Sequence, residues 1–337
     1  MSMIPPDEII ERCSYTYGAR IFDDAFISIK PSENTDERKP LPTRSRSSCG
    51  RFDRLPTEII QKIFSSLPLA QMTECRTLSS HLKTIIASEP VYFRLQTKTY
   101  SGFRRIMYLT GFSAYFTATQ IYEVFCTPIC SRCTSFGFFL YLPECVRCCW
   151  SCIKDNQDLL PVTQSEAMAG FGITLGELKS STIPTIRTLP GKYGLLEQEY
   201  RQTYHLMSPR LVRTSINRPL TPAQQRKKEL HDAKDPYARH KDEVYQYLCT
   251  VYLPYFDPKT QETYEGIGCR GCRKEVSVAL RQAATSNQIF KFSLSILFRR
   301  QYTMFTHVTF IEHFERCEAA QQLYHSSKST PQCQDYY

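Results

Sequence analysis

Cysteines are concentrated in one short stretch of this chain. Seven of its fifteen cysteines lie between Cys126 and Cys152. In a reducing compartment, a dense and regularly spaced cluster of this kind indicates metal ligands rather than disulfides. Cys130 and Cys133 have the C-x2-C spacing that lets two thiolates reach one ion from adjacent backbone positions. They are therefore the expected first pair of a zinc site.

The second pair of this site has two candidates. Cys145/Cys148 and Cys149/Cys152 have the same spacing, so spacing alone does not choose between them. We favour Cys149 and Cys152, because Trp150 would then lie against the metal. Four thiolates around one ion make a closed structural zinc site. A binuclear cluster and a group of buried free thiols are the alternatives.

A second candidate site lies near the C-terminus, where Cys269-x2-Cys272 is followed by His313-x3-Cys317. Residues four apart share one face of a helix, so His313 and Cys317 can bind one ion together. Closing the intervening loop costs about 3 kcal/mol plus a constant. A structural zinc ion contributes about 10–16 kcal/mol, which exceeds that cost. We expect a second structural zinc ion here, and the alternative is an unrelated knuckle with a surface histidine.

Catalysis is not indicated. Both predicted sites use four protein ligands, which leaves no open position where a metal could activate water. The sequence also lacks the nucleophile-elbow, phosphate-loop, zinc-protease and dinucleotide-binding motifs. We therefore expect a non-catalytic protein.

The composition limits the class of protein further. The chain has 337 residues and a net charge of +9, which permits an acidic or nucleic-acid partner without requiring one. No apolar run approaches the ~18 residues that span a bilayer, and the N-terminus lacks the pattern of a secretory signal. We expect no membrane segment, and a location in the cytoplasm and/or nucleus.

Helical periodicity begins after Leu55-Pro56. Apolar residues spaced three and four apart follow until Pro68, which should end this helix. Thr73 is expected to cap a second helix, and a last apolar patch runs from Val91 to Leu95. These segments predict a small helical unit over 52–98. Units of this size are usually marginal alone and need a partner or a neighbouring domain.

The remaining segments favour a mainly α fold with irregular zinc-stabilised segments, with α+β also possible. Aromatic residues over 99–142 are expected in the core rather than stacked on bases. Two capping boxes, at Thr163 and Thr174, predict two short helices, and Thr221-Pro222 should start another. The aromatic run 245–256 is expected to be helical. The expected domains are a mostly disordered segment 1–51, a three-helix unit 52–98, a cysteine-rich region 99–216, a C-terminal region 217–325 with the second zinc site, and a disordered tail 326–337.

The helical unit resembles a known family. The segment from Leu55 to Leu69, LPTEIIQKIFSSLPL, resembles the F-box, and CRTLS at 75–79 matches the second helix of that family. Leu82 stands where the family often has tryptophan. The later pattern, with FGFFLYLP before the second cysteine group, Phe171-Gly-Ile-Thr and Leu189-Pro-Gly-x-Tyr193, resembles a group of cysteine-rich F-box proteins from filamentous fungi.

This resemblance implies a substrate receptor of an SCF-type (cullin-RING) ubiquitin ligase. The F-box would dock on a Skp-type adaptor and through it on a cullin scaffold, while the rest of the chain would hold an unknown protein target. The residues expected to meet the adaptor are Leu55, Pro56, Ile59, Ile60, Ile63, Phe64, Leu67, Pro68 and Leu69. The alternative is a zinc-dependent nucleic-acid-binding protein, motivated by the net charge and the knuckles.

Overall fold

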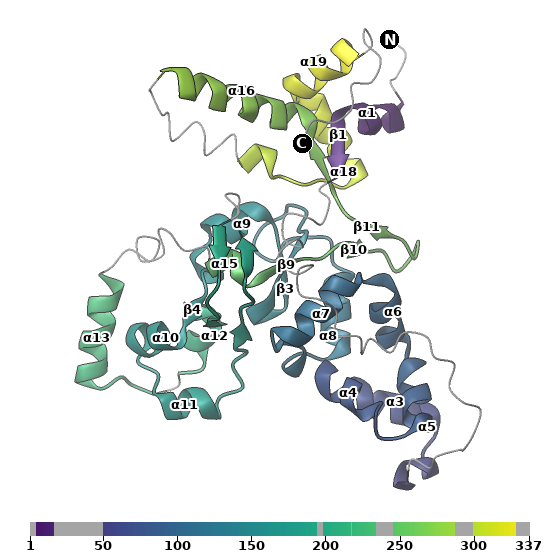
Figure 1. Ribbon diagram of the computed structural model, residues 1–337, viewed down its shortest axis with the longest axis vertical. Coiled ribbons are helices and arrows are strands. Elements are labelled where there is room, and N and C mark those ends of the chain that lie inside the picture. The colour runs from purple at the N-terminus through teal and green to yellow at the C-terminus, as the bar shows by residue number, and fades with distance from the viewer. Residues whose placement is uncertain are drawn as a thin grey trace.

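The computed structural model describes residues 5–16, 50–193, 198–216, 218–233, 245–286 and 299–327. Helices dominate and the strands are short, which confirms the mainly helical class with some strands. Figure 1 shows the helices of the 52–98 unit at one end, a central body, and a separate unit that contains α1, α16 and α19 at the opposite end. Among the described residues, no helix has the length and apolar character needed to cross a membrane.

The 52–98 unit consists of a short 3-10 turn, η1 (Gly50–Arg54), and the helices α3 (Thr57–Ser65), α4 (Leu69–Cys75), α5 (Ser80–Ala87) and α6 (Pro90–Lys98). The expectation of one continuous helix from Thr73 is wrong. The chain turns after Cys75, and the Ser79 hydroxyl accepts the Leu82 N–H at 3.1 Å, which starts a new helix. Pro56 and Pro68 stand immediately before α3 and α4, as their missing N–H groups allow.

The aromatic stretch that follows lies in the core, as expected. It forms α7 (Ser101–Leu109), the turn η2 (Phe112–Ala114) and α8 (Ala118–Phe125). Its buried rings are Phe103, Phe112, Phe116, Phe125, Phe136, Phe138, Phe139 and Tyr141. These rings are covered by neighbouring side chains, so they offer no face on which a base could stack. Tyr108 and Tyr115 are the exposed exceptions in this stretch.

A three-stranded antiparallel sheet forms the middle of the central body. Its order is β3 (Val146–Cys148), β2 (Phe139–Tyr141) and β9 (Thr250–Tyr252), with Leu140 opposite both Arg147 and Val251. The expectation of a helix over 245–256 is wrong beyond its first turn. After α15 (Tyr245–Leu248) the β-branched and aromatic residues of β9 pair with β2 instead, and β10 (Tyr255–Phe256) pairs with β11 (Thr263–Tyr264).

Short helices and strands flank this sheet. α9 (Trp150–Asp155) follows β3, between the turns η3 (Leu142–Glu144) and η4 (Gln157–Leu159). Both predicted capping boxes are confirmed, at the starts of α10 (Gln164–Phe171) and α11 (Leu175–Ser180), and α13 (Pro222–Asp232) begins at the predicted Thr221-Pro222. The remaining elements are α12 (Pro209–Thr214), the sheet of β4 (Val162–Thr163), β8 (His205–Met207) and β5 (Ile186–Arg187), and the hairpin of β6 (Gly191–Tyr193) and β7 (Gln198–Tyr200).

The last unit is built from both ends of the chain. It contains β12 (Ile267–Cys269), α16 (Arg270–Ser286), α18 (His307–Arg316) and α19 (Glu318–Ser327), together with α1 (Pro6–Cys13) and β1 (Ser14–Thr16). β1 pairs antiparallel with β12, placing Ser14 opposite Cys269. Residues 6–16 are therefore ordered within a segment expected to be mostly disordered. The apolar groups at 21–22 and 26–29, expected as a strand or docking segment, lie outside the described residues.

Burial explains why the N-terminal helix is part of this unit. Ile9 and Cys13 are 5% and 0% exposed, and they share a separate core with Phe310, Phe314 and Tyr324. The apolar face of α1 is thus covered by helices more than 290 residues further along the chain. A contact between segments this far apart leaves no local pattern in the sequence, so it could not be predicted from the sequence.

Ile9→Ala should destabilise this unit selectively. Removing a buried isoleucine side chain costs about 2–5 kcal/mol of unfolding free energy. Amide hydrogen exchange measured by mass spectrometry should therefore become faster in α18 and α19 and stay unchanged in α3 to α5. Glu11→Ala, at an exposed position of the same helix, is the matched control and should alter neither region. Unchanged exchange in α18 and α19 of the Ile9 variant would contradict the packing described.

Candidate functional site

The first cysteine cluster is built from two knuckles. Cys130 and Cys133 lie in a tight turn closed by the bridge between Ile129 and Phe136 and by the Cys130 N–H, which donates to the Ser135 carbonyl at 2.9 Å. Cys149 is the N-cap of α9, and its sulfur accepts the Cys152 N–H at 3.5 Å. The helix start thus brings two thiols to one side of the first turn.

The four sulfurs of Cys130, Cys133, Cys149 and Cys152 all lie within 4.8 Å of one another. The Cys133 and Cys149 sulfurs are 3.6 Å apart. A tetrahedral zinc site with Zn–S bonds of about 2.3 Å places its sulfurs about 3.8 Å apart. A disulfide needs about 2.0 Å, and the described cysteines are all free thiols. The spacing therefore fits a shared ion rather than a covalent bond.

Cys145 and Cys148, the other candidate pair, are not part of this set of four, although the Cys148 thiol is hydrogen-bonded to Cys130. Cys148 is fully buried, and its sulfur lies 3.9 Å from the Ser131 hydroxyl. Cys145 is the residue with a left-handed backbone that ends η3, and burial raises the pKa of its thiol to about 12. Of the two second pairs that the spacing allows, the structure brings Cys149 and Cys152 to Cys130 and Cys133.

Proton sharing links the thiols of the first cluster. Hydrogen bonds from the Cys148 and Cys149 thiols hold the pKa of Cys130 far below its usual range. The pKa of Cys149 is raised by its hydrogen bond to Cys130 and by burial. Burial, followed by the charge on Cys130, raises the pKa of Cys152 to about 12. One thiolate surrounded by thiols is what a metal-binding cluster contains before the ion displaces the remaining protons.

A buried carboxylate supports the first knuckle from outside. Glu144 has a side chain that is only 1% exposed, and it accepts hydrogen bonds from Arg132 at 2.8 Å and Arg210 at 2.6 Å. The Ser208 hydroxyl also donates to it at 2.5 Å. Because Arg132 lies between the two cysteines of the knuckle, this network fixes the knuckle against α12. Contacts of this kind orient metal ligands without touching the ion.

The second cluster contains Cys269, Cys272, His313 and Cys317, whose ligand atoms also lie within 4.8 Å of one another. The Cys272 sulfur is 3.8 Å from the Cys317 sulfur and 3.5 Å from the His313 Nε2 atom. A tetrahedral zinc site predicts about 3.8 and about 3.6 Å for these two distances. Cys269 ends β12 and Cys272 lies in the first turn of α16, while His313 and Cys317 come from the end of α18.

The second cluster also contains thiolate charge, which favours a bound cation. Hydrogen bonds from the Cys269 and Cys272 thiols depress the pKa of Cys317 far below its usual range. Burial lowers the pKa of His313, but its hydrogen bonds to Cys269 and Cys317 outweigh burial and bring it to about 9. The His313 ring also stacks on Phe305 at 4.4 Å. A proton on His313 therefore neutralises thiolate charge that a metal ion would otherwise neutralise.

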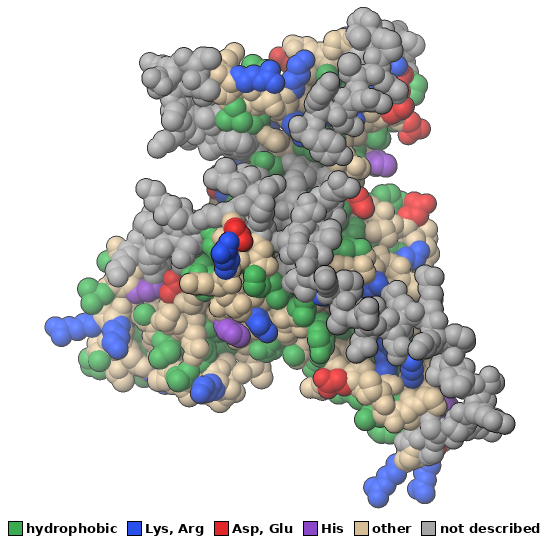
Figure 2. Space-filling model, in the orientation of Figure 1, with side chains coloured by type: hydrophobic (Ala, Val, Ile, Leu, Met, Phe, Trp, Pro, Cys, Tyr) green, Lys and Arg blue, Asp and Glu red, His purple; other side chains and the backbone are tan. Residues whose placement is uncertain are grey.

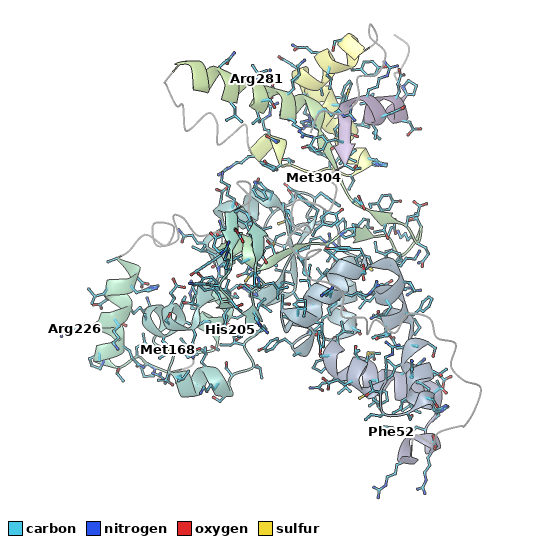
Figure 3. The ribbon with its side chains drawn as sticks, in the orientation of Figure 1. Phe52, Met168, His205, Arg226, Arg281 and Met304 are labelled. Carbon is cyan, nitrogen blue, oxygen red and sulfur yellow. The ribbon has the colours of Figure 1, made fainter. Side chains whose placement is uncertain are left out.

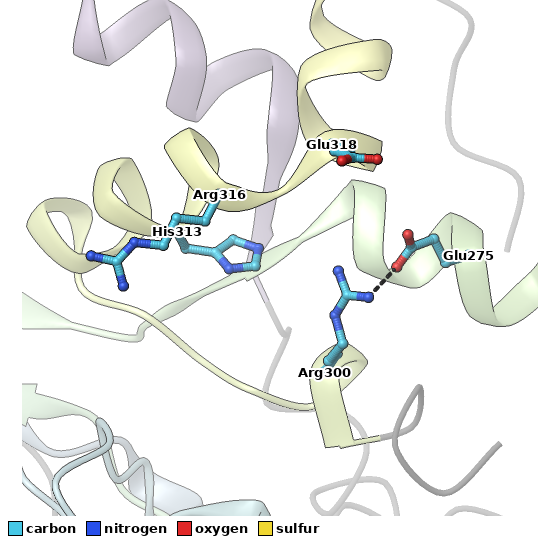
Figure 4. Close-up of a pocket in the computed structure, with 5 residues that line it drawn as sticks. All are labelled: Glu275, Arg300, His313, Arg316 and Glu318. Carbon is cyan, nitrogen blue, oxygen red and sulfur yellow. Dashed lines mark ion pairs between the residues drawn. The ribbon is translucent and has the colours of Figure 1, made fainter. Parts of the chain in front are cut away.

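A polar pocket of about 460 Å³ opens beside this cluster (Figure 4), and His313 contributes to its lining. The other lining residues are Glu275, Arg300, Arg316 and Glu318. Arg300 pairs with Glu275 at 3.0 Å and donates to the Cys317 sulfur at 3.9 Å. The lining thus contains side chains of both charges beside the ring of His313.

An apolar face lies at the free end of the 52–98 unit. Phe52, Leu55, Ile59 and Ile63 are 36%, 39%, 46% and 38% exposed. Figure 3 shows Phe52 at this end, and Figure 2 shows basic side chains gathered there. Leu55, Ile59 and Ile63 follow one another at spacings of four residues, and exposed apolar side chains grouped in this way are typical of a protein interface.

The nine residues expected to meet an adaptor divide into two groups. Leu55, Pro56, Ile59 and Ile63 are exposed, and Leu67 and Pro68 are partly exposed. Ile60, Phe64 and Leu69 are 2%, 4% and 4% exposed and belong to the core of the chain itself. Residues four apart lie on one face of a helix. Ile60 and Phe64 therefore share the buried face of α3, and Ile59 and Ile63 share its exposed face. Phe52 was not among the nine, although its ring packs on Phe64 at 5.7 Å.

Comparison with known proteins identifies one part of the chain. Residues 52–94 match the F-box domain, so the chain carries an F-box domain formed by η1, α3 to α5 and the start of α6. No curated protein and no solved structure matches the chain. The two cysteine-rich groups lie outside the matched residues.

Metal affinity at both clusters should rise with pH. The raised pKa values of Cys149, Cys152 and Cys272 keep these thiols protonated near neutral pH without metal, and a bound ion must displace their protons. Titration with Co²⁺, followed by its thiolate charge-transfer absorbance, should give a higher apparent affinity at about pH 8 than at about pH 6 and should release protons. Affinity that is independent of pH would contradict the ligand assignment.

Proposed function

We propose that this protein is the substrate receptor of an SCF-type ubiquitin ligase. Its F-box domain docks on a Skp-type adaptor, which connects it to a cullin scaffold, and the rest of the chain recruits a protein target for ubiquitination. The observation that carries the proposal is the F-box domain at 52–94 with its outer apolar face exposed. F-box proteins are generally non-catalytic adaptors, and the chain itself performs no chemistry in this role.

The division of the F-box residues supports docking physically. Ile60 and Phe64 are buried in the core of the chain, and α3 packs against α5, so α3 is anchored by its own chain. Leu55, Ile59 and Ile63 then project from a rigid helix, which keeps the entropy cost of binding low. Apolar anchors at spacings of four residues are typical of a helix that binds in a partner's groove.

The non-catalytic role also agrees with the donor sets of the two clusters. We propose that each holds one structural zinc ion, with four cysteines in the first and three cysteines and a histidine in the second. Thiolate and imidazole ligands in a tetrahedral arrangement favour zinc over the hard cations. Four protein ligands leave no open position, so the ions would stabilise the structure and provide no reactive water.

Recruitment acts by proximity. A receptor raises the local concentration of its target beside the ligase, so its output depends on geometry rather than on a reaction at its own residues. The central body and the C-terminal unit, which together contain both candidate metal centres, are the parts proposed to hold the target.

Replacing Leu55 and Ile59 by alanine should weaken adaptor binding strongly. Each truncation of a central apolar anchor typically costs on the order of 1–3 kcal/mol, so the double variant should bind at least about tenfold more weakly. The measurement is the Kd for a purified Skp-type adaptor by isothermal titration calorimetry. Because both residues are exposed, the thermal stability of the free chain should change little.

The matched control is the double variant Tyr108→Ala and Val308→Ala. Both side chains are 72% exposed and lie on α7 and α18, outside the F-box domain. This variant should bind the adaptor as tightly as the natural chain. Equal binding by the F-box variant, or no binding by the natural chain, would count against the proposed function.

A further inference from the structure

One continuous hydrophobic core joins the F-box domain to the first metal cluster. Ile60, Phe64 and Met72 of the F-box belong to the same buried group as Cys130 and Cys149. The second cluster is different, because Cys269, Cys272 and Cys317 lie in a core of their own. A unit the size of the F-box alone has a small core, so its stability depends on what continues that core.

Arg147 connects the first cluster to this shared core. It is 2% exposed, and its main-chain carbonyl accepts the Ser131 N–H of the first knuckle at 2.8 Å. Its guanidinium donates hydrogen bonds to the carbonyl oxygens of Val124, Phe125, Gly137, Leu253 and Pro254 at 2.6–3.3 Å. Val124 and Phe125 form the C-terminal end of α8, where a cation is favoured by the helix dipole.

The atoms around Gly137 are closely packed, with no room for a side chain at this position. A Cβ atom at Gly137 would lie 2.7 Å from the Arg147 Cγ and 3.2 Å from the Cys130 Cα. Gly137 is therefore packed closely against both the Arg147 side chain and the Cys130 backbone. A change in the knuckle must move Arg147 or open a gap beside it.

The segment around α8 in turn supports the F-box domain. The Leu69 N–H at the start of α4 donates to the Phe116 carbonyl at 2.9 Å, and Pro68 forms a β-bridge with Thr117, the N-cap of α8. At the other side, the Arg94 guanidinium of α6 lies 5.8 Å from the centre of the Tyr122 ring of α8. α8 thus lies between the metal cluster and the F-box helices.

We propose that metal binding at the first cluster controls adaptor docking by the F-box domain, with Arg147 as the positioning residue that connects them. The inference rests on the proposed docking function and adds a regulator to it, a thiophilic divalent cation. Without the ion, the two knuckles lose their common anchor. The Ser131 N–H that donates to the Arg147 carbonyl, and the Gly137 backbone that packs on the Arg147 side chain, are then no longer held in place. The F-box domain then spends less time in its binding-competent form, and the apparent Kd for the adaptor rises in proportion.

The test compares two matched double variants of the full chain, Cys133→Ser/Cys152→Ser and Cys272→Ser/Cys317→Ser. Each replaces two thiols of one cluster. The readouts are the Kd for a purified Skp-type adaptor in Zn²⁺-containing buffer and hydrogen exchange in α4, α6 and α8. We expect the first variant to bind at least about tenfold more weakly, with faster exchange in these helices. The second should bind within about twofold of the natural chain, with faster exchange confined to its own unit.

Arg147→Lys separates the connection from general unfolding. Lysine keeps the charge and leaves every metal ligand in place, but one ammonium group cannot reach five carbonyl oxygens. This variant should keep its full metal content and still bind the adaptor more weakly. The proposal would be overturned if the two cysteine variants lost adaptor affinity equally. It would also be overturned if adaptor binding and hydrogen exchange were unchanged both in the first variant and in Arg147→Lys. If the natural chain bound no adaptor, docking itself would fail, and exchange in α4, α6 and α8 would still decide whether the cluster supports these helices.

Discussion

The buried guanidinium of Arg147 is the interaction on which the central body depends. Five main-chain oxygens surround it, from the end of α8, from Gly137 just after the first knuckle, and from the segment after β9. Burial lowers its pKa to about 9, which still leaves it charged at neutral pH. Burying a charge is costly unless hydrogen bonds compensate for the lost water. Because the acceptors come from separate parts of the chain, the cost is met only when all of those parts are assembled together.

The metal clusters impose a similar constraint on two other sets of segments. Within the described ranges the strands are two or three residues long, and many of the helices have fewer than ten residues. Elements of this length are weak by themselves. Thiols from distant turns converge within 4.8 Å at each cluster, and an ion there would hold the short elements in register. In the second unit, the N-terminal strand β1 adds a further connection by pairing with β12 beside Cys269.

The sequence predicted those features of the structure that depend on contacts between residues close together in the chain. The C-x2-C spacing located both knuckles of the first cluster, and the C-x2-C and H-x3-C spacings located the second cluster. The F-box domain was visible in fifteen consecutive residues. The capping boxes at Thr163 and Thr174 rely on contacts across three residues, and they form as expected. The break between α4 and α5 was missed because Ser79 competes with the helix through its own side chain, a contact that apolar periodicity does not report.

Features made by distant pairings could not be predicted in this way. β9 is a strand because β2 lies beside it, more than a hundred residues earlier in the chain. α1 is ordered because its apolar face meets α18 and α19. Arg147 is an arginine between a valine and a cysteine, and nothing adjacent to it marks a buried cation with acceptors drawn from Val124 to Pro254. Spacing alone left Cys145/Cys148 and Cys149/Cys152 open, and the favoured pair, Cys149/Cys152, is the one that the start of α9 places beside Cys130 and Cys133.

Native mass spectrometry of the full chain co-expressed with a Skp-type adaptor tests the central claim most directly, because one spectrum reports partner, stoichiometry and bound metal together. The account predicts one dominant species that contains one chain, one adaptor and two zinc ions. A spectrum that shows the chain without the adaptor would contradict it. A mass that shows oxidised cysteine pairs in place of metal would contradict it as well.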